Sequence, residues 1–229
     1  MHVDPGQIQA MGDAALLVTC AEQPGDAASR RVLALDAALR AAEWPGVIAL
    51  VPAYTTLLVH VDLAQTTLAA VASAIAHMPI PPQPLADQRT WQIPVVYDGA
   101  DVAEVAARLG LAVQHVVALH ASQPYSVACL GFAPGFAYLS GLPADLHLPR
   151  RATPRSEIPA GSLILGGQQT AIMPLAMPSG WHILGRTRAK LFDAQRAEPS
   201  LLCPGDTVRF VPVAAADLPH VEVRCEATR

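Results

Sequence analysis

Lysine is nearly absent from this sequence, and several common catalytic motifs are missing with it. Lys190 is the only lysine among 15 basic residues, and leucine follows it rather than serine or threonine, so the chain has no phosphate-binding P-loop. The four cysteines are far apart and form no C-x-x-C pair for zinc or redox chemistry. A net charge of −4 disfavours an electrostatic nucleic-acid binder.

The histidines and serines also lack the spacing of familiar hydrolase motifs. Neither H-E-x-x-H nor G-x-S-x-G occurs. His115 and His120 are five residues apart, off the spacing that places helical metal ligands on one face. Metal-dependent and serine hydrolases are therefore disfavoured. Cys129 lies in an apolar run, where we predict a buried, inert thiol, with a nucleophile as the alternative.

We expect neither a membrane span nor a secretory leader in this chain. No run of about 18 apolar residues occurs. The first residues, MHVDP, lack a basic stretch followed by an apolar one. We therefore expect a soluble, cytoplasmic protein that acts on neither a membrane nor a nucleic acid.

The chain does contain enough apolar sequence for a substantial core. Its 229 residues are 52% hydrophobic and 15% charged, which suits one large domain or two small ones. The clearest break is MPIPPQP at 78–84, where four prolines in six residues favour an extended linker. We predict a boundary near residues 79–89, between an N-terminal α+β domain over 1–80 and a second domain over 90–229.

The first 78 residues alternate strand and helix patterns. Apolar, β-rich runs over 14–19, 47–51 and 56–61 predict strands, the last two as an antiparallel pair. Two helices are predicted around them, one opening at residues 25–26 and one over about 62–75. Few polar groups lie on these helices, so we interpret this half as an α/β sandwich with a scaffold role.

The second half begins with a strand and two short helices and then becomes mostly β. Residues 91–97 predict the strand, and Asp101 with Glu104 predict a capping box at the first helix. His120 lies on the apolar face of the second helix, where a core histidine is the alternative to a catalytic one. After Tyr125, short β-rich pieces divided by glycine and proline indicate a sandwich or barrel.

Four segments of this half could carry chemistry. Residues 131–139, GFAPGFAYL, display three aromatics around a rigid turn, as a binding loop or as a plug at a barrel end. Residues 149–155, PRRATPR, gather three arginines that suit a carboxylate or phosphate, or that merely pair with nearby acids. Residues 161–170, GSLILGGQQT, contain a glycine turn that either cradles an anion or closes a hairpin. Residues 180–187, GWHILGRT, add an aromatic, an arginine and a threonine.

Taken in order, these segments resemble a known family: that of the 5-oxoprolinase B subunit, which also contains the kinase-inhibitor protein KipI and subunit 1 of allophanate hydrolase. The resemblance covers nearly the whole chain. It is carried by the motifs at 131–139, 149–155, 159–162, 180–187 and 205–210, and by those at 12–16 and 52–59 in the first half. Departures from the family pattern, which bear on ligand specificity more than on fold, occur at Asp98, Ala171, Met173 and Ser179.

The resemblance implies a small N-terminal α/β sandwich followed by a C-terminal cyclophilin-like β-barrel. It also implies that the chain is the B subunit of an ATP-dependent 5-oxoprolinase, a hydrolase that opens 5-oxo-L-proline to L-glutamate. Its partners would be the A subunit of that enzyme and the C subunit, which is built on a related barrel. ATP, with Mg²⁺, would be shared with these partners. The alternatives are a KipI-like inhibitor of a sensor histidine kinase and allophanate hydrolase subunit 1 or a urea-carboxylase-like carboxyltransferase.

Such a reaction needs cations against developing phosphate charge and donors for the substrate carboxylate. The candidate catalytic residues are His120, Arg150, Arg155 and Arg186. The candidate substrate- or nucleotide-binding residues are Phe132, Pro134, Gly135, Phe136, Tyr138, Gln169, Trp181 and Thr187. We expect the three arginines, Gln169 and His120 to face one pocket beside Phe132 and Phe136. Arg155 is expected to bind an anion through a two-point fork, and no metal ligands are predicted.

Overall fold

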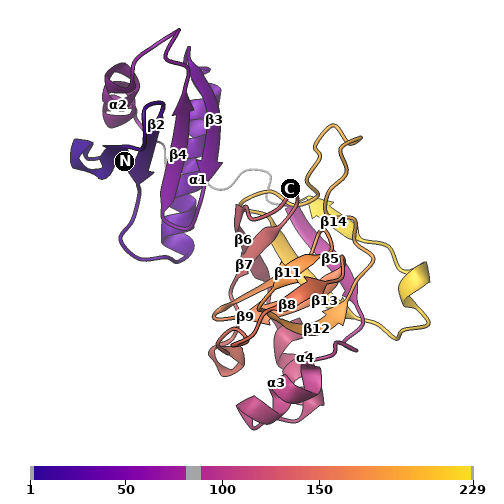
Figure 1. Ribbon diagram of the computed structural model, residues 1–229. Helices are drawn as coiled ribbons and strands as arrows, with labels where there is room; N and C mark the ends of the chain where they lie inside the picture. Colours follow the sequence, from indigo (N-terminus) through magenta and orange to yellow (C-terminus); the bar gives the residue numbers. More distant parts are fainter. Residues whose placement is uncertain (1–2, 81–88, 228–229) are drawn as a thin grey trace. The chain divides into compact units, whose positions relative to one another are not determined.

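The computed structural model describes residues 3–80 and 89–227, and the chain divides into two compact units (Figure 1). The N-terminal unit spans Met1–Ala86 and the C-terminal unit Asp87–Arg229. Most of the predicted proline-rich linker falls on residues 81–88, which lie outside the described residues. Each unit has a hydrophobic core of its own.

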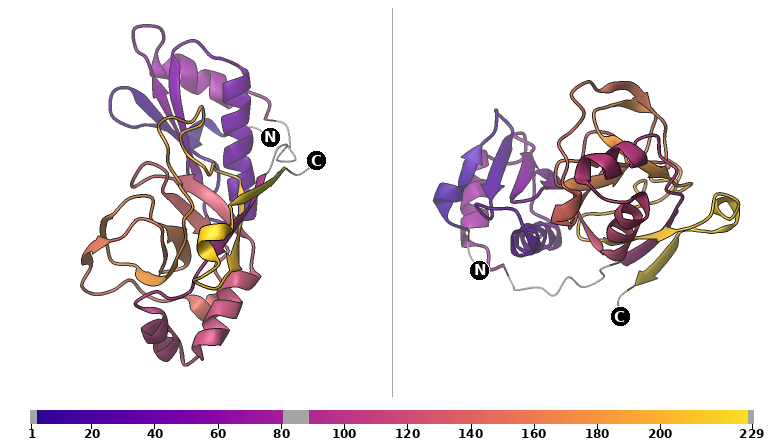
Figure 2. Two further views of the ribbon diagram at one scale, coloured as in Figure 1. Left: turned by 90° about the vertical axis from the view of Figure 1, so that its right-hand side faces the viewer. Right: turned by 90° about the horizontal axis from the view of Figure 1, so that it is seen from below.

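The N-terminal unit is a four-stranded antiparallel sheet with helices packed on it (Figure 2). Its elements are η1 (Pro5–Gln7), β1 (Ile8–Ala10), β2 (Ala15–Thr19), α1 (Asp26–Ala41), β3 (Val47–Pro52), β4 (Thr56–Val61) and α2 (Leu68–His77), with strand order β1-β2-β4-β3. Alternation along β4 buries Leu57, Val59 and Val61 in one core with Leu35 of α1 and Ile75 of α2. The three predicted strands and the first helix are confirmed. The second helix begins at Leu68 and not near residue 62, because the Asp62 carboxylate holds a turn there by accepting the N–H of Ala64 and the side-chain amide of Gln65.

The C-terminal unit is built on an eight-stranded sheet. The strands of the C-terminal unit as a whole are β5 (Arg89–Val95), β6 (Tyr125–Leu130), β7 (Ala137–Ser140), β8 (Arg155–Ile158), β9 (Ser162–Gly166), β10 (Gln169–Ile172), β11 (Met177–Ser179), β12 (His182–Arg186), β13 (Thr207–Pro212) and β14 (Arg224–Ala227). The large sheet has the order β12-β9-β10-β7-β6-β13-β5-β14, and β8 pairs separately with β11. Short 3-10 turns lie at η2 (Ala144–Leu146) and η3 (Leu218–His220).

Two short helices, α3 (Val102–Leu109) and α4 (Val113–Ser122), pack on this sheet. Gly110 ends α3 in a left-handed conformation with φ of 66°. Val105 and Val116 are fully buried and anchor the two helices in the main core. Within the described parts of the chain, no single helix is long and apolar enough to cross a membrane; only α3 and α4 together meet the length and composition, as a pair bent by 95°.

The expected barrel is not seen as a closed ring of paired strands among the described residues. β12 and β14 end the sheet order, and one isolated antiparallel bridge, between Val96 and Arg186, links the end of β5 to β12. Both of its hydrogen bonds form, with N–O distances of 2.9 and 2.8 Å. The mixed α+β class is confirmed, and the large sheet folds back on itself at this one bridge.

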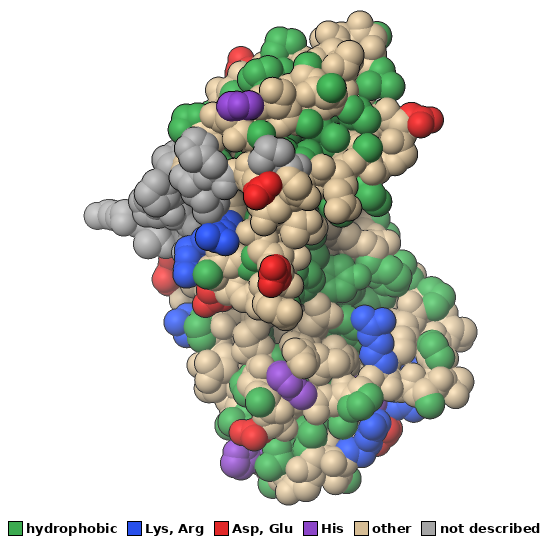
Figure 3. All heavy atoms as spheres, turned by 90° about the vertical axis from the view of Figure 1, so that its left-hand side faces the viewer, with side chains coloured by type: hydrophobic (Ala, Val, Ile, Leu, Met, Phe, Trp, Pro, Cys, Tyr) green, Lys and Arg blue, Asp and Glu red, His purple; other side chains and the backbone are tan. Residues whose placement is uncertain are grey.

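Alternation in the central strands separates two apolar clusters. Leu163 and Leu165 of β9 belong to the main core, whereas Ile164 between them belongs to a smaller cluster with Phe136 and Trp181. Hydrophobic side chains also reach the surface, as Figure 3 shows for one face of the protein. The smaller cluster is the apolar base on which the candidate site is built.

The bridge depends on Gly185, the residue before Arg186. A Cβ at Gly185 would overlap the carbonyl oxygen of Val96. We expect Gly185→Ala to lower the free energy of unfolding of the C-terminal unit by roughly 2–3 kcal/mol, because the two strands must separate to admit the methyl group. Urea unfolding followed by the fluorescence of Trp91 and Trp181, in a Trp44→Phe background, measures this loss.

Gly131→Ala is the matched control, because a Cβ there would meet only a ring carbon of Tyr138 at 3.9 Å. It should change the free energy of unfolding by no more than about 0.5 kcal/mol. Equal stabilities of the Gly185 and Gly131 variants would contradict the close approach at the bridge.

Candidate functional site

A pocket of about 280 Å³ opens on the C-terminal unit beside the smaller apolar cluster. It is lined by Phe132, Phe136, Tyr138, Arg150, Pro154, Pro178, Ser179, Gly180 and Trp181. Its rings meet edge to face: the centroid of Phe136 is 4.9 Å from that of Tyr138 and 6.1 Å from that of Trp181. The pocket thus brings together four of the predicted aromatic residues and one of the predicted arginines.

The loop between β6 and β7 forms one wall of this aromatic pocket. The N–H of Ala133 donates to the carbonyl of Gly131 at 2.8 Å, which closes a three-residue turn centred on Phe132. Phe132 has a φ of 70°, a conformation that large residues rarely adopt, and its side chain is 60% exposed. Backbone strain of this kind costs on the order of 1–3 kcal/mol and gathers at binding sites. The turn therefore holds an exposed aromatic ring at the pocket.

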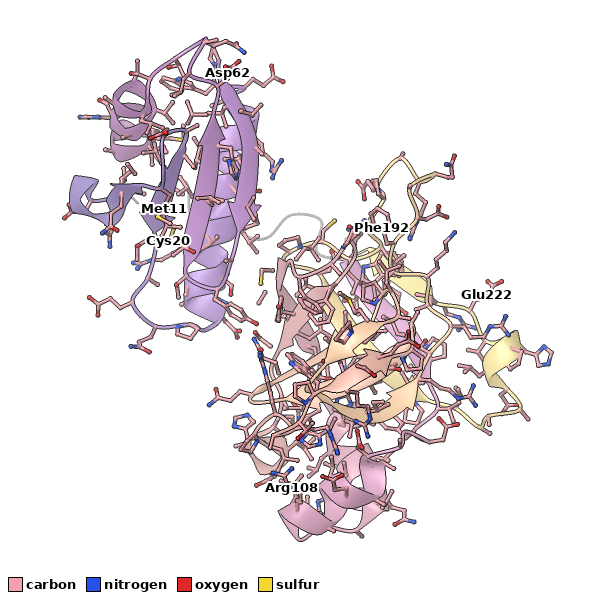
Figure 4. The ribbon with its side chains drawn as sticks, in the orientation of Figure 1. Met11, Cys20, Asp62, Arg108, Phe192 and Glu222 are labelled. Atoms are coloured by element: carbon pink, nitrogen blue, oxygen red, sulfur yellow. The ribbon has the colours of Figure 1, made fainter. Side chains whose placement is uncertain are left out.

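Two glycines set how closely the walls approach. Gly135 has a φ of 78°, and a Cβ there would lie 2.8 Å from the Cβ of Phe192, which Figure 4 labels. A Cβ at Gly166 would lie 2.9 Å from the ring of Trp181. The indole therefore rests directly on the backbone of β9. Gly135, predicted as a binding residue, lies outside the pocket lining and shapes its wall.

Arg150 supplies the guanidinium of the pocket lining. Its Cζ lies 5.4 Å from the centroid of the Trp181 ring, which is a cation–π contact. Among the described residues, no carboxylate forms an ion pair with Arg150; the ion pairs of this region use other arginines. Arg150 thus keeps its charge available to a ligand.

The backbone around Arg150 is held at two points. Nε2 of His182 donates to the carbonyl of Pro149 at 3.0 Å. The N–H of Arg151 donates to the carbonyl of Gly180 at 2.7 Å. These two bonds tie the residues before and after Arg150 to the segment that carries Trp181, so the guanidinium and the indole are positioned together.

Asp101, a buried carboxylate at the start of α3, binds the other arginines of the PRRATPR segment. Nη1 and Nη2 of Arg155 donate to its two oxygens at 2.8 and 2.5 Å, and Nη1 of Arg151 adds a bond of 3.2 Å. The N–H of Ile183 donates to it at 2.8 Å. Burial raises the pKa of Asp101, but the hydrogen bonds from Arg155 and Ile183 and the charges of both arginines lower it more, so the pKa lies below its ordinary value.

Two expectations are corrected by this cluster. Arg155 forms the predicted two-point fork, but the anion is Asp101 of the same chain, and Arg155 is not part of the pocket lining. Asp101 makes no side-chain cap on α3, because its carboxylate is occupied by Arg155, Arg151 and Ile183. The two partners are 54 residues apart, so no local pattern revealed the pair.

Most of the other predicted residues also lie outside the pocket lining. Arg186 pairs with Asp98 at 3.0 Å, and Gln169 begins β10. Thr187 is buried with its hydroxyl oxygen accepting a backbone N–H, and Pro134 is exposed in the β6–β7 loop. The shared pocket expected for three arginines is therefore wrong, since one guanidinium lines it. The functional roles of these residues stay predictions.

His120 lies in the main core, fully buried, and is another correction to the expected pocket. The hydroxyl of Thr170 donates to a backbone carbonyl at 2.8 Å, so its oxygen accepts Nε2–H of His120 at 2.9 Å. Nδ1 then accepts the hydroxyl of Tyr97 at 2.9 Å. Burial lowers the pKa of His120 to about 3, so the ring is neutral at physiological pH. This geometry supports the core-histidine interpretation.

Two of the four unpaired cysteines, Cys20 and Cys129, are buried. Burial raises the pKa of each thiol to about 11, which suits the inert thiol predicted for Cys129. Both buried thiols therefore stay protonated at physiological pH. In the described ranges, no group of three or more histidine, cysteine or acidic side chains could hold a metal ion.

Four residues at the β8–β11 pair line the pocket but were not among the predicted site residues. Pro154, Pro178, Ser179 and Gly180 line the pocket from this pair and its ends. The available signal was the proline and glycine content of these positions, which is typical of any turn.

The glycine turn after β9 does not cradle an anion through Gly167, because the N–H of Gly167 donates to the carbonyl of Leu148 at 2.7 Å.

A known protein family and a known protein each match this chain over most of its length. The family model described as carboxyltransferase domain, subdomain C and D, matches residues 6–202. A protein of Bacillus subtilis (strain 168), named as the B subunit of 5-oxoprolinase, is 33% identical over 228 residues, covering 92% of this chain and 94% of that protein. Its namesake from Escherichia coli O157:H7 is 56% identical over 129 residues, 55% of this chain. That match spans only 59% of the E. coli protein.

Solved structures show the same fold. The crystal structure of TTHA0988 superimposes with a TM-score of 0.80 at 38% identity, covering 88% of this chain and 40% of that one. Urea carboxylase of Kluyveromyces lactis superimposes with a TM-score of 0.75 at 16% identity, covering 96% of this chain and 24% of that one. The second similarity is one of fold alone.

Removal of Arg155 tests the role of Asp101. We expect Arg155→Ala to lower the free energy of unfolding of the C-terminal unit by about 3 kcal/mol, because a buried carboxylate loses its two-point partner. Arg155→Lys keeps the charge without the fork and should recover less than half of the loss. Arg186→Ala removes an exposed pair and should cost less than about 1 kcal/mol in the same urea unfolding assay. An Arg155→Ala protein as stable as the unchanged chain would contradict this assignment.

The buried His120 predicts a specific pH dependence of stability. In the unfolded chain a histidine takes up a proton below about pH 6.5, whereas the folded His120 stays neutral down to about pH 3. Stability should therefore decrease by about 1.4 kcal/mol for each pH unit lost below 6.5. His120→Gln removes this contribution, so its stability should depend less on pH between 6.5 and 4.5, as measured by urea unfolding.

His115→Gln serves as the control, because His115 is an exposed residue of the same helix. It should retain the pH dependence of the unchanged chain. The assignment of a neutral, buried His120 fails if the His120 and His115 variants show the same pH dependence.

Proposed function

The chain belongs to the carboxyltransferase domain family of subdomains C and D, together with proteins named as the B subunit of 5-oxoprolinase, and we propose that it fills that role in a 5-oxoprolinase. The observation that carries this proposal is the match to a protein of that name along nearly the whole of both chains. In this role the chain belongs to a hydrolase that opens the ring amide of 5-oxo-L-proline to give L-glutamate.

The ring amide must be activated before water can open it, because an amide carbonyl is a weak electrophile. Transfer of a phosphoryl group from ATP to the amide oxygen supplies that activation. The step needs cations against the phosphate charge and a partner for the substrate carboxylate. The described part of this chain offers the pocket one guanidinium without a carboxylate partner, that of Arg150, among aromatic walls. It therefore provides part of a substrate site and not a full set of catalytic groups.

The missing groups come from partner subunits in this proposal. We assign these partners as the A subunit of the enzyme and the C subunit, which is built on a related barrel, with ATP and Mg²⁺ shared among them. The absence of a P-loop from the sequence supports a shared nucleotide site. A cyclophilin-like barrel in the C-terminal unit is part of the same proposal, and the bridge between Val96 and Arg186 supports it.

We expect the purified chain to be inactive alone and active only after co-expression with A and C subunits of a 5-oxoprolinase. The physical reason is that one unpaired guanidinium cannot stabilise both a transferring phosphoryl group and a substrate carboxylate. The measurement is ATP-dependent formation of L-glutamate from 5-oxo-L-proline by the single chain and by the co-purified complex.

A preparation of the A and C subunits without this chain is the control and should lose at least about 100-fold in rate, as expected when a binding surface is removed. Turnover by the single chain, or full activity of the other two subunits without it, would refute the assignment. Inhibition of a histidine kinase without any lactam hydrolysis would favour the KipI-like alternative.

A further inference from the structure

We infer that the aromatic pocket binds a small, flat acid with a single carboxylate and excludes nucleotides, with Arg150 as the residue that binds the carboxylate. This inference rests on the proposed function and deepens it. It assigns the pocket to the substrate acid and leaves ATP to another part of the assembly.

The size of the pocket is the first argument. Pockets that hold drug-sized ligands have volumes of roughly 300–1,000 Å³. At about 280 Å³ the aromatic pocket lies just below that range. It therefore suits a ligand of one small ring and not a base, a ribose and a chain of phosphates together.

The shape and chemistry of the walls are the second argument. Phe136, Tyr138 and Trp181 present ring faces and edges, with the centroids of Tyr138 and Trp181 6.3 Å apart. Phe132 adds an exposed ring 5.3 Å from Phe136. Such walls contact the faces of a flat ring and offer little to a flexible polar chain.

The count of available charges is the third argument. Arg155 is paired with Asp101, Arg151 with Asp101 and Glu104, and Arg186 with Asp98, so these cations are already neutralised. Of the residues that the structure describes, Arg150 alone brings a guanidinium into the pocket lining. A polyphosphate carries several negative charges and would leave most of them without a partner, which is costly in a partly apolar site. One carboxylate matches one guanidinium.

The backbone of the pocket loop is the fourth argument. Phosphate-binding loops present several unpaired amide N–H groups to the ligand. Here the N–H groups of Gly131, Ala133 and Phe136 donate to carbonyls within the loop, at 3.1, 2.8 and 2.9 Å. Pro134 has no N–H. The loop therefore resembles a phosphate cradle in its glycines, but three of its N–H groups are already occupied by carbonyls of the loop itself.

The position of Arg150 is suited to a carboxylate. Its guanidinium lies over the face of Trp181, and the N–H groups of a guanidinium point outward in its own plane. A carboxylate can then accept two parallel hydrogen bonds at the free edge while its attached ring packs against the aromatic walls. The bonds from His182 and Arg151 on either side hold this geometry before any ligand arrives.

The test is isothermal titration calorimetry with three probes, on the full chain and on its complex with the A and C subunits. The probes are 5-oxo-L-proline, its neutral amide 5-oxo-L-prolinamide, and ATP. We expect the acid to bind to this chain at least about tenfold more tightly than the amide, because only the acid forms the charge-assisted fork. ATP should give no binding to the chain alone.

Variants locate the effect. Arg150→Gln should weaken binding of the acid by about 10- to 100-fold and leave the amide unchanged, so that the two bind equally. Arg150→Lys should restore only part of the preference, since it lacks the fork. Phe132→Ala should weaken acid and amide alike. Arg209→Gln, at an exposed arginine of β13 outside the pocket, is the matched control and should bind like the unchanged chain.

Several results would overturn the inference: equal binding of acid and amide, binding of ATP by the chain alone, a preference for the acid that survives Arg150→Gln, or no binding of the acid by either preparation. The proposed function has a separate readout. If the complex hydrolyses 5-oxo-L-proline with the KM unchanged by Arg150→Gln, the function stands and the pocket assignment fails. If 5-oxo-L-proline binds in an Arg150-dependent way while the complex does not hydrolyse it, the pocket assignment stands and the function fails.

Discussion

The candidate site depends on one buried carboxylate, Asp101, which is 1% exposed. A charge in that position is stable only if donors surround it, and the chain supplies them from Arg155, Arg151 and the N–H of Ile183. These donors come from β8, from the loop before it and from β12. Satisfying Asp101 therefore brings together the segments that flank Arg150 and Trp181. The electrostatic requirement of a residue outside the pocket lining thus helps to shape the pocket.

The same requirement determines the electrostatic character of the pocket. Arg150 and Arg151 are neighbours in sequence, yet Arg151 is bonded to Asp101 and Glu104 while Arg150 lies on the indole of Trp181. Because the surrounding arginines are paired with carboxylates, the region keeps the charge of one unpaired guanidinium, that of Arg150. A partly apolar pocket strengthens that one interaction, because water competes less well there. Selectivity between a carboxylate and a polyphosphate then follows from charge count and not from the number of arginines in the motif.

Much of the fold could be predicted from local patterns. The strands and helices of the N-terminal unit and the many short strands after Tyr125 follow from periodicity and from glycine and proline, whose effects act within a few residues. The candidate site was predicted less well. The aromatic residues of GFAPGFAYL do meet Trp181 and Arg150, but Arg155 and His120 proved to be held by Asp101, Thr170 and Tyr97 inside the chain. The type of a residue indicates that it can bind an anion or a proton. It does not show which group in the folded chain the residue binds.

The sequence by itself determined the mixed α+β class and the family, because these depend on composition, short-range pattern and the order of motifs. Only the tertiary structure decided which polar groups remain available. Arg155 and Asp101 are 54 residues apart, and Arg186 and Asp98 are 88 apart. Such pairs form when the sheet brings distant segments together, and a charge neutralised across that distance leaves no trace in the local sequence. Arg150 is distinguished from its neighbours for that reason: the fold gives it an aromatic ring where it gives them carboxylates.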